Sequence, residues 1–388
     1  MVAGGVLSVM TFPGQTAGLS VFADPLIEQL GIDRAALSLS YLIGTLLGAA
    51  VQPFVGRMLD RTDARRVIIA IAVLFSGILF ALSFVGDIVG LTAGYVGVRM
   101  FGQGALGLAA TTAVAQIVRR RRGLALGISG AVGSAGISLA PVLLERVVSE
   151  VGIAAAWRLE AVAVLVVVIP IALLLPRPQP RVEEVQRTST GTIRIAGYTG
   201  KQARRTAMFW VLTGALSTSS MLGTALGFHQ IALLGERGLT PLEAAANFVP
   251  QTVTALLTTL LVGSLIDRHD PRIFVAGSMA AMAASLLLVP VVTPGGVAII
   301  YGLVLGVAGG ALRGMEAAAF VRYYGLTHIG SIRGLAVSIS LAASALGPYA
   351  LAVGADWAGS FGTPSVWFAI LPGAVAVLAA FTRPPRRT

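Results

Sequence analysis

Long apolar stretches separated by short polar turns account for almost the whole chain. Stretches of about 20 apolar residues, the length of helix that crosses roughly 30 Å of hydrocarbon, occur twelve times. They begin near residues 3, 36, 67, 88, 124 and 157, and then near 207, 241, 273, 297, 334 and 363. This pattern predicts an all-α polytopic membrane protein with twelve membrane-spanning helices.

One polar segment in the middle of the chain is long. Residues 176–206 begin with three closely spaced prolines and continue through two glutamates into a stretch rich in Ser, Thr and Gly. Such a composition cannot bury a core of its own. We therefore expect two six-helix bundles over residues 1–175 and 207–388, joined by a linker over 176–206.

A short charged turn occurs twice, at half the length of the chain. It reads GRMLDRTDAR from Gly56 and GSLIDRHDPR from Gly263, 207 positions later, and each copy lies between two apolar runs. Internal repeats of this kind are typical of transporters built from two like halves. The candidate gating positions in the two turns are Gly56, Asp60, Arg61, Arg65, Gly263, Asp267, Arg268 and Arg272.

The chemistry of these turns suggests a gate. A carboxylate at the end of a helix can accept hydrogen bonds from the exposed amides of a neighbouring helix N-terminus, and the arginines can pair with acids across the two halves. Such contacts would hold one face of the molecule closed. The alternative is that the arginines only fix the orientation of the chain and contact lipid head groups.

Composition and charge agree with a membrane protein. The chain is 56% hydrophobic and only 12% charged, and its mean hydropathy is +0.85. The basic residues gather in the linker, in the C-terminal tail and in the loops on the same side, so the positive-inside rule predicts that both termini are cytoplasmic. This orientation accounts for the net charge of +11, and since the basic residues are scattered over separate loops, no nucleic-acid partner is expected. Membrane lipids are expected neighbours.

Several classes of chemistry are disfavoured. There is no cysteine and there are three histidines, so we expect no metal site, no cofactor and no catalytic constellation. No phosphate-binding loop occurs, which argues against ATP-driven pumping. Arginine outnumbers lysine 27 to one, a bias that suggests a bacterial genome and hence the cytoplasmic (inner) membrane.

The predicted helices, the linker and the G-x-x-x-D-R-x-x-x-R turn together resemble the major facilitator superfamily over the whole chain. A finer resemblance lies at Arg119–Gly130, which is similar to the opening of helix 5 in monocarboxylate and oxalate/formate transporters, and at Tyr323–Gly334 in the second half. Asp63 and Asp270 depart from the usual turn, and the predicted helix 8 lacks the cation that the finer resemblance implies. The resemblance implies a monomeric secondary transporter that works by alternating access.

Three charges fall within predicted membrane helices, where each costs roughly 2.5 to 3.5 kcal/mol on insertion scales. They are Arg99, Arg313 and Glu316. Arg99 begins the stretch RMFGQG, which resembles, with one residue's slippage, the R-x-x-Q-G signature of proton-coupled family members. We expect Arg313 to attract an anionic substrate while Glu316, three residues away on the same helix face, takes up a proton; the alternative is a simple intrahelical pair. His229 is a second proton candidate, or else a satisfied histidine at a helix end.

Neutral amides complete the candidate substrate site: Gln15, Gln103, Gln230 and Gln251. The family resemblance implies that helices 1, 4, 7 and 10 face a central cavity, which favours Gln15 and Gln230 together with the two arginines. Any of these amides can instead bond between helices. Pro13 and Gly14 predict a bend in the first helix.

These observations predict a secondary transporter that moves a small organic anion such as a monocarboxylate, coupled to protons. The alternative within transport is a proton-driven efflux antiporter for drugs or metabolites. A membrane sensor that binds its ligand without translocating it is a weaker alternative, since the chain offers no room for a signalling domain.

Overall fold

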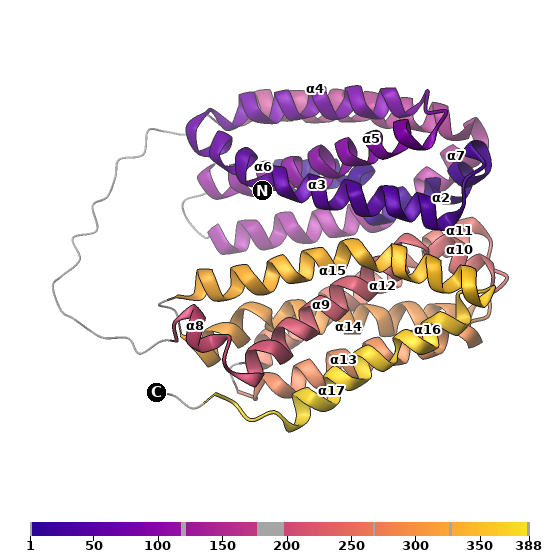
Figure 1. The fold of residues 1–388 in the computed structure, drawn as a ribbon. Helices are drawn as coiled ribbons and strands as arrows, with labels where there is room; N and C mark the ends of the chain where they lie inside the picture. Colours follow the sequence, from indigo (N-terminus) through magenta and orange to yellow (C-terminus); the bar gives the residue numbers. More distant parts are fainter. Residues whose placement is uncertain (1, 118–121, 177–197, 267, 326–327, 386–388) are drawn as a thin grey trace.

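The computed structural model describes residues 2–117, 122–176, 198–266, 268–325 and 328–385. Within these ranges the regular structure is helical, and the helices form two bundles that lie side by side (Figure 1). We call the end at which α7 stops and α9 begins the linker end, and the opposite end the far end. Residues 177–197, most of the predicted linker, lie outside the described residues.

The N-terminal bundle contains two interrupted helices. The first membrane helix consists of α1 (Val2–Val9), a 3₁₀ turn (Phe12–Gly14) and α2 (Thr16–Leu30), and the fourth consists of α5 (Ile88–Val98), a π-helical stretch (Arg99–Leu106) and α6 (Gly107–Ile117). The others are α3 (Arg34–Arg61), α4 (Ala64–Leu82) and α7 (Arg122–Leu174), which is two helices joined at Gly152.

The C-terminal bundle begins with the short α8 (Gly200–Ala203) and the long α9 (Ala207–Phe228). At the far end α10 (Gln230–Gly235) and α11 (Pro241–Ala246) lead into α12 (Phe248–Leu265). The remaining helices are α13 (Pro271–Leu288), α14 (Gly296–Tyr324), α15 (Ile329–Ala358), α16 (Gly362–Phe368) and α17 (Ile370–Phe381).

The predicted number of membrane helices is confirmed. Among the described residues, nine continuous helical stretches are long and apolar enough to cross a membrane. One of them, residues 127–174, contains two spans that meet at Gly152, where φ is 79° and ψ is 168°. The interrupted first and fourth helices supply the remaining two spans, because each is too broken to form one continuous stretch.

The interruptions of the first and fourth helices lie against each other. Pro13 cannot donate a backbone hydrogen bond, and Gln15 is extended, with φ −83° and ψ 155°. The bend predicted from Pro13 and Gly14 is therefore present. A Cβ atom on Gly14 would lie 2.3 Å from the backbone oxygen of Val98 and 2.8 Å from the Cα of Gly102. Only glycine permits this approach.

The two bundles pack together at the far end. The rings of Tyr41 and Phe228 lie 4.5 Å apart, and the Arg34 guanidinium lies 5.6 Å from the centre of the Phe361 ring. One apolar core runs from the N-terminal bundle into these far-end residues of the C-terminal bundle. A separate core, which includes Phe209, fills the linker end of the C-terminal bundle alone. The far end is thus closed in this conformation.

Candidate functional site

The two charged turns make matching contacts at the linker end. Arg65 donates from Nε to the backbone oxygen of Leu175, 2.8 Å away, at the end of α7. In the second half, Arg272 donates from Nη1 to the backbone oxygen of Thr382, 3.0 Å away, just after α17. The donors are 207 positions apart and so are the acceptors. The internal repeat thus extends from the sequence to the contacts, and each arginine satisfies the C-terminal carbonyls of the last helix of its own half.

The departures from the usual turn sequence have a structural role. Asp63 accepts a hydrogen bond from the Arg65 backbone N–H, and Asp270 accepts one from that of Arg272, so each aspartate caps the following helix. Asp270 also accepts a hydrogen bond from the Tyr323 hydroxyl. Burial would raise the pKa of Asp270, but these hydrogen bonds and the charge of Arg272 outweigh it and lower the pKa.

The structure leaves part of the predicted gate undescribed. Asp267 and the side chains of Asp60 and Arg61 lie outside the described part. Gly56, Gly263 and the exposed Arg268 lie at the linker end. In this conformation Arg65 and Arg272 contact carbonyls of their own halves. Pairing across the halves therefore stays a prediction for the opposite conformation, in which the linker end is closed.

Arg313 is an exposed cation in the middle of a membrane helix. Within the described part of the chain, no acid and no hydrogen-bond acceptor is paired with it. A Cβ atom on Gly309 would lie 3.5 Å from the Arg313 Nη1, so the guanidinium lies along its own helix, one turn nearer the far end.

Helical geometry fixes the direction in which Arg313 extends. Gly310 meets the backbone of α12, since a Cβ atom there would lie 2.4 Å from the Ala255 oxygen. Seven residues after Arg313, Phe320 packs on Phe209 of α9, with ring centres 6.4 Å apart. Residues seven apart share a helix face, so Arg313 lies on the side of α14 that faces α9.

Glu316 does not pair with Arg313. Its Oε1 lies 2.9 Å from Nη2 of Arg333, on α15. The intrahelical pair considered from the sequence is therefore replaced by a pair between two helices, because Arg333 brings a second cation to the same carboxylate. This arrangement leaves Arg313 without its nearest acid.

Arg99 is enclosed within the N-terminal bundle, with 3% of its surface exposed. It donates from Nε to the Thr45 hydroxyl and from Nη1 to the Gly14 backbone oxygen, each at 3.0 Å. Its guanidinium also lies 4.6 Å from the centre of the Tyr41 ring. All of these partners are neutral. In this conformation Arg99 ties the broken first helix to the fourth, and its predicted contact with substrate is untested.

The four amides divide into two groups. Gln15 donates to the Thr11 hydroxyl at 3.0 Å, beside the break in the first helix, and Gln103 is exposed. Gln230 and Gln251 bond directly to each other, with 2.7 Å between the Gln251 Nε2 and the Gln230 Oε1. This pair joins α10 to α12, which is the interhelical bonding considered as the alternative for these amides.

His229 lies in the closed contact at the far end. Its Nε2 is 2.9 Å from the Pro348 backbone oxygen and 3.4 Å from the hydroxyl of Ser38, which belongs to the other bundle. Its ring lies 5.2 Å from that of Phe361. The Nδ1 atom is buried and has no partner among the described residues. The imidazole thus belongs to the far-end contact between the two bundles. We call this contact the joint; it includes Arg34, Ser38, Tyr41, Phe228, His229 and Phe361.

One buried acid was missed from the sequence. Both carboxyl oxygens of Glu160 are buried and have no hydrogen-bond partner among the described residues. The predicted span begins near residue 157, which put Glu160 at a helix end. The helix begins directly after Gly152, so Glu160 lies two turns inside it. The long apolar run that follows was the only sequence signal for it.

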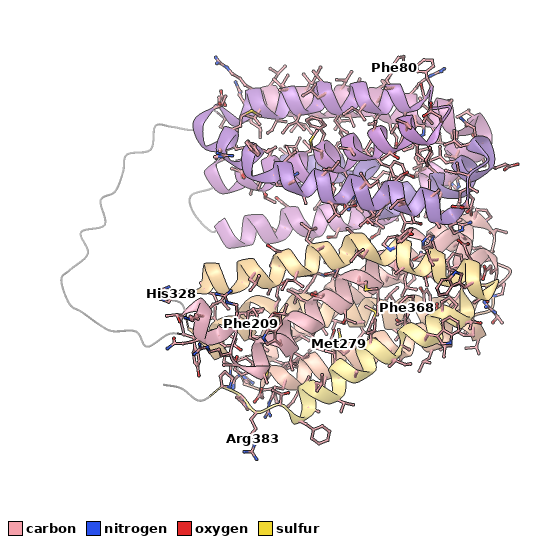
Figure 2. All side chains as sticks on the ribbon, in the orientation of Figure 1. Phe80, Phe209, Met279, His328, Phe368 and Arg383 are labelled. Atoms are coloured by element: carbon pink, nitrogen blue, oxygen red, sulfur yellow. The ribbon has the colours of Figure 1, made fainter. Side chains whose placement is uncertain are left out.

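The ends of the molecule differ in charge. Figure 2 shows His328 and Phe209 at the linker end of the C-terminal bundle, and Arg383 beyond α17 at the same end. The far end carries the acids of the short loops. The lysine and arginine side chains that the structure describes at the linker end are Arg57, Arg65, Arg66, Lys201, Arg204, Arg205, Arg268, Arg272, Arg322, Arg333 and Arg383.

Comparison with known proteins places this architecture in context. Residues 5–348 match the family model described as Major Facilitator Superfamily. A bacterial homologue of the human lysosomal transporter Spinster, in an inward-facing and occupied conformation, is 18% identical, with a TM-score of 0.73 over 98% of this chain and 96% of that one. The nucleoside transporter NupG is 14% identical, with a TM-score of 0.79 over 98% of each chain. At these identities the similarity shows the fold and not the substrate. No curated protein sequence matches the chain.

Proposed function

This chain belongs to the major facilitator superfamily, and from that premise we propose that it is a proton-coupled secondary transporter of a small organic anion such as a monocarboxylate. Membership of this family of membrane transporters supports alternating access of a central site to the two sides of the membrane.

The observation that carries the anion proposal is Arg313, which has no ion-pair or hydrogen-bond partner among the described residues. A guanidinium at mid-membrane depth costs several kcal/mol unless it meets an opposite charge or water. The nearest acid, Glu316, is held by Arg333 instead. Arg313, exposed on the α9-facing side of α14, is therefore available to a substrate carboxylate, whose planar oxygens suit two parallel N–H donors.

Coupling to protons follows from the position of Glu316. An anion bound at Arg313 lies within one helical turn of the Glu316 carboxylate and repels it. Protonation of Glu316 relieves this repulsion, so anion and proton favour each other's binding and move together. His229, in the joint at the far end, is the second proton candidate, and the amides Gln15 and Gln103 and the buried Arg99 are the candidate contributions of the N-terminal bundle.

The same proposal sets an orientation. The basic residues gathered at the linker end support a cytoplasmic location for that end and for both termini. With the far end closed, the transporter would then be captured open toward the cytoplasm. The internal repeat supplies both halves of the gate, so one chain suffices for transport.

Thermal stabilisation of the purified protein tests the anion site, because a ligand that binds only the folded state raises the melting temperature. We would scan monocarboxylates, dicarboxylates, nucleosides and lipophilic cations at pH 5.5 and 7.5. We expect stabilisation by a carboxylate, greater at pH 5.5, and its loss in Arg313→Gln. Arg66→Gln, which removes an exposed linker-end charge, should keep it.

Two results would oppose the proposal. Stabilisation by lipophilic cations alone, unchanged in Arg313→Gln, would favour drug efflux. Carboxylate binding without exchange of internal for external ligand in proteoliposomes would favour a sensor.

A further inference from the structure

Glu160 is a buried carboxyl that the proposed transport mechanism does not use. It lies two turns into the second helix of α7, and neither carboxyl oxygen has a hydrogen-bond partner within the described residues. Three residues before it, the Trp157 indole N–H is also buried and has no partner in the described part of the chain. A carboxylate in such surroundings would lack both water and a counter-ion, which costs several kcal/mol. A neutral, protonated Glu160 would avoid this cost.

Among the side chains that the structure describes, the helices around Glu160 offer no cation to the carboxyl. On α4, Ser76 donates to the Ala161 backbone oxygen at 2.8 Å, and on α2, Phe22 stacks on Trp157 with ring centres 3.6 Å apart. Arg158 turns to the Ser83 hydroxyl at 3.1 Å. The other charged groups on the helices packed here are Asp24, which is paired with Arg34, and Glu28, Arg65, Arg66, Glu145, Arg146 and Glu150. None of them is hydrogen-bonded to Glu160 within the described residues.

The helix that covers this region also closes the far end. Through Phe22, α2 covers the Trp157 side of α7. On its other side α2 meets α9 of the C-terminal bundle, where a Cβ atom on Gly227 would lie 3.8 Å from the Thr16 methyl group. The break at Phe12–Gly14 separates α2 from α1, so α2 can pivot at Gln15 independently of the rest of its helix.

We propose that Glu160 is a proton-binding site that α2 loads as the far end closes. When the bundles separate at the far end, α2 moves, water reaches the carboxyl and the proton leaves to that water. When they close again, Phe22 returns against Trp157, the carboxyl is dehydrated and one proton is taken up. This inference rests on the alternating access proposed above. It adds a proton site in the N-terminal bundle to those at Glu316 and His229.

Proton linkage makes the proposal measurable without a substrate. If closure binds one proton, low pH must favour the closed far end, by up to about tenfold in population per pH unit. Since the chain has no cysteine, Ser38→Cys would place the only thiol in the far-end contact. Its labelling by a membrane-impermeant maleimide is compared with that of Ser149→Cys, which is exposed at the same end. The reference corrects for the effect of pH on thiol reactivity.

We expect relative labelling at position 38 to fall as the pH falls in the otherwise unchanged protein. Glu160→Gln imitates the neutral carboxyl, so its far end should stay closed. Its labelling should depend less on pH, because closure then binds one proton fewer. Glu160→Asp should keep it. Unchanged pH dependence in Glu160→Gln would overturn the proposal.

Infrared spectroscopy supplies a second test that does not depend on the thiol. The protein at neutral pH should show a carbonyl band of a protonated carboxyl, and Glu160→Gln should lack that band. If the band of the protonated carboxyl is the same in the two proteins, Glu160 is ionised and the proposal is wrong. Loss of carboxylate binding at Arg313 would leave both readouts unchanged, so the two proposals fail independently.

Discussion

The carboxylate of Glu316 lies 2.9 Å from the guanidinium of Arg333 on the neighbouring helix α15. Both side chains are partly exposed, at 26% and 37% of their surface, so the pair itself contributes about 1 kcal/mol or less to stability. Its larger effect is on Arg313. The pair holds the only acid within one turn of that arginine on α14, and thereby keeps the arginine's charge available.

Arg333→Gln should therefore weaken anion binding more than it weakens the fold. Freed from Arg333, Glu316 can reach Arg313 three residues away and compete with a substrate carboxylate. We expect a small change in melting temperature without ligand, and a loss of carboxylate stabilisation of about tenfold in apparent affinity. Arg333→Lys should retain most of the binding. Normal binding in Arg333→Gln would separate Glu316 from the anion site.

The contacts of Arg65 and Arg272 predict a matched pair of stability effects. Removing either side chain leaves the C-terminal carbonyls of α7 or α17 without their charged donor, at a cost of about 1 kcal/mol each. Arg65→Ala should cost more, because Arg65 also donates to the Leu173 oxygen. Melting temperatures in detergent measure both effects, with Arg66→Ala as the exposed control. The two losses should add, since the sites lie in separate bundles.

The hydrogen bond from Tyr323 to Asp270 predicts a pH-dependent contribution to stability. The folded-state pKa of Asp270 lies below its ordinary value of 3.8, so its contribution is complete above that pH and is lost as the pH falls through the folded pKa. Tyr323→Phe removes one donor and allows the pKa to rise. The stability difference from the unchanged protein should be full at pH 7 and should close below pH 3.8.

Tyr324→Phe is the matched control for this prediction. The Tyr324 hydroxyl bonds to the neutral Thr206 hydroxyl at 2.8 Å. Its removal should cost a similar amount at every pH. A Tyr323→Phe difference that is equally flat would mean that Asp270 is not the group involved.

The fold was predictable because the length of each apolar stretch and the internal repeat are patterns that involve many residues at once. All twelve spans and the repeat of 207 residues are confirmed, as is membership of the superfamily. The finer resemblance to the monocarboxylate branch has no counterpart among the comparisons and stays a proposal. The bend at Pro13–Gly14 was predictable for a local reason, the missing backbone donor. The π-helical stretch opposite it was not, since it depends on how closely Gly14 approaches Gly102.

The site was less predictable, because partner choice depends on tertiary contacts. The spacing of three residues in the sequence predicted a pair between Glu316 and Arg313. In the structure Glu316 pairs instead with Arg333, which lies on the next helix, α15. The direct bond between Gln230 and Gln251 also depends on how α10 meets α12. Glu160 was missed because a small error in a helix start separates an acid at the end of a membrane helix from one that lies two turns inside it.

The ring of Phe361 predicts how firmly the far end is closed. It belongs to the C-terminal bundle, where its backbone N–H donates to Glu236 at 2.9 Å and its ring lies 5.2 Å from that of His229. Across the joint, Arg34 of the other bundle lies 5.6 Å from the ring centre. The contact between Phe361 and Arg34 crosses the two bundles, so its loss acts directly on the equilibrium between conformations. Phe361→Ala should destabilise closure by about 1 to 2 kcal/mol, which is roughly a 5- to 30-fold change in population.

Labelling of Ser38→Cys from the far side, relative to Ser149→Cys, should increase accordingly. Phe84→Ala is a control for the cation–π contact alone, because Arg158 lies 4.9 Å from the centre of the more exposed Phe84 ring and both residues belong to the N-terminal bundle. That variant loses a similar cation–π contact but none across the joint, so its labelling should be unchanged. Equal labelling in Phe361→Ala and Phe84→Ala would mean that closure depends on other contacts of the joint, such as those of Tyr41 and His229.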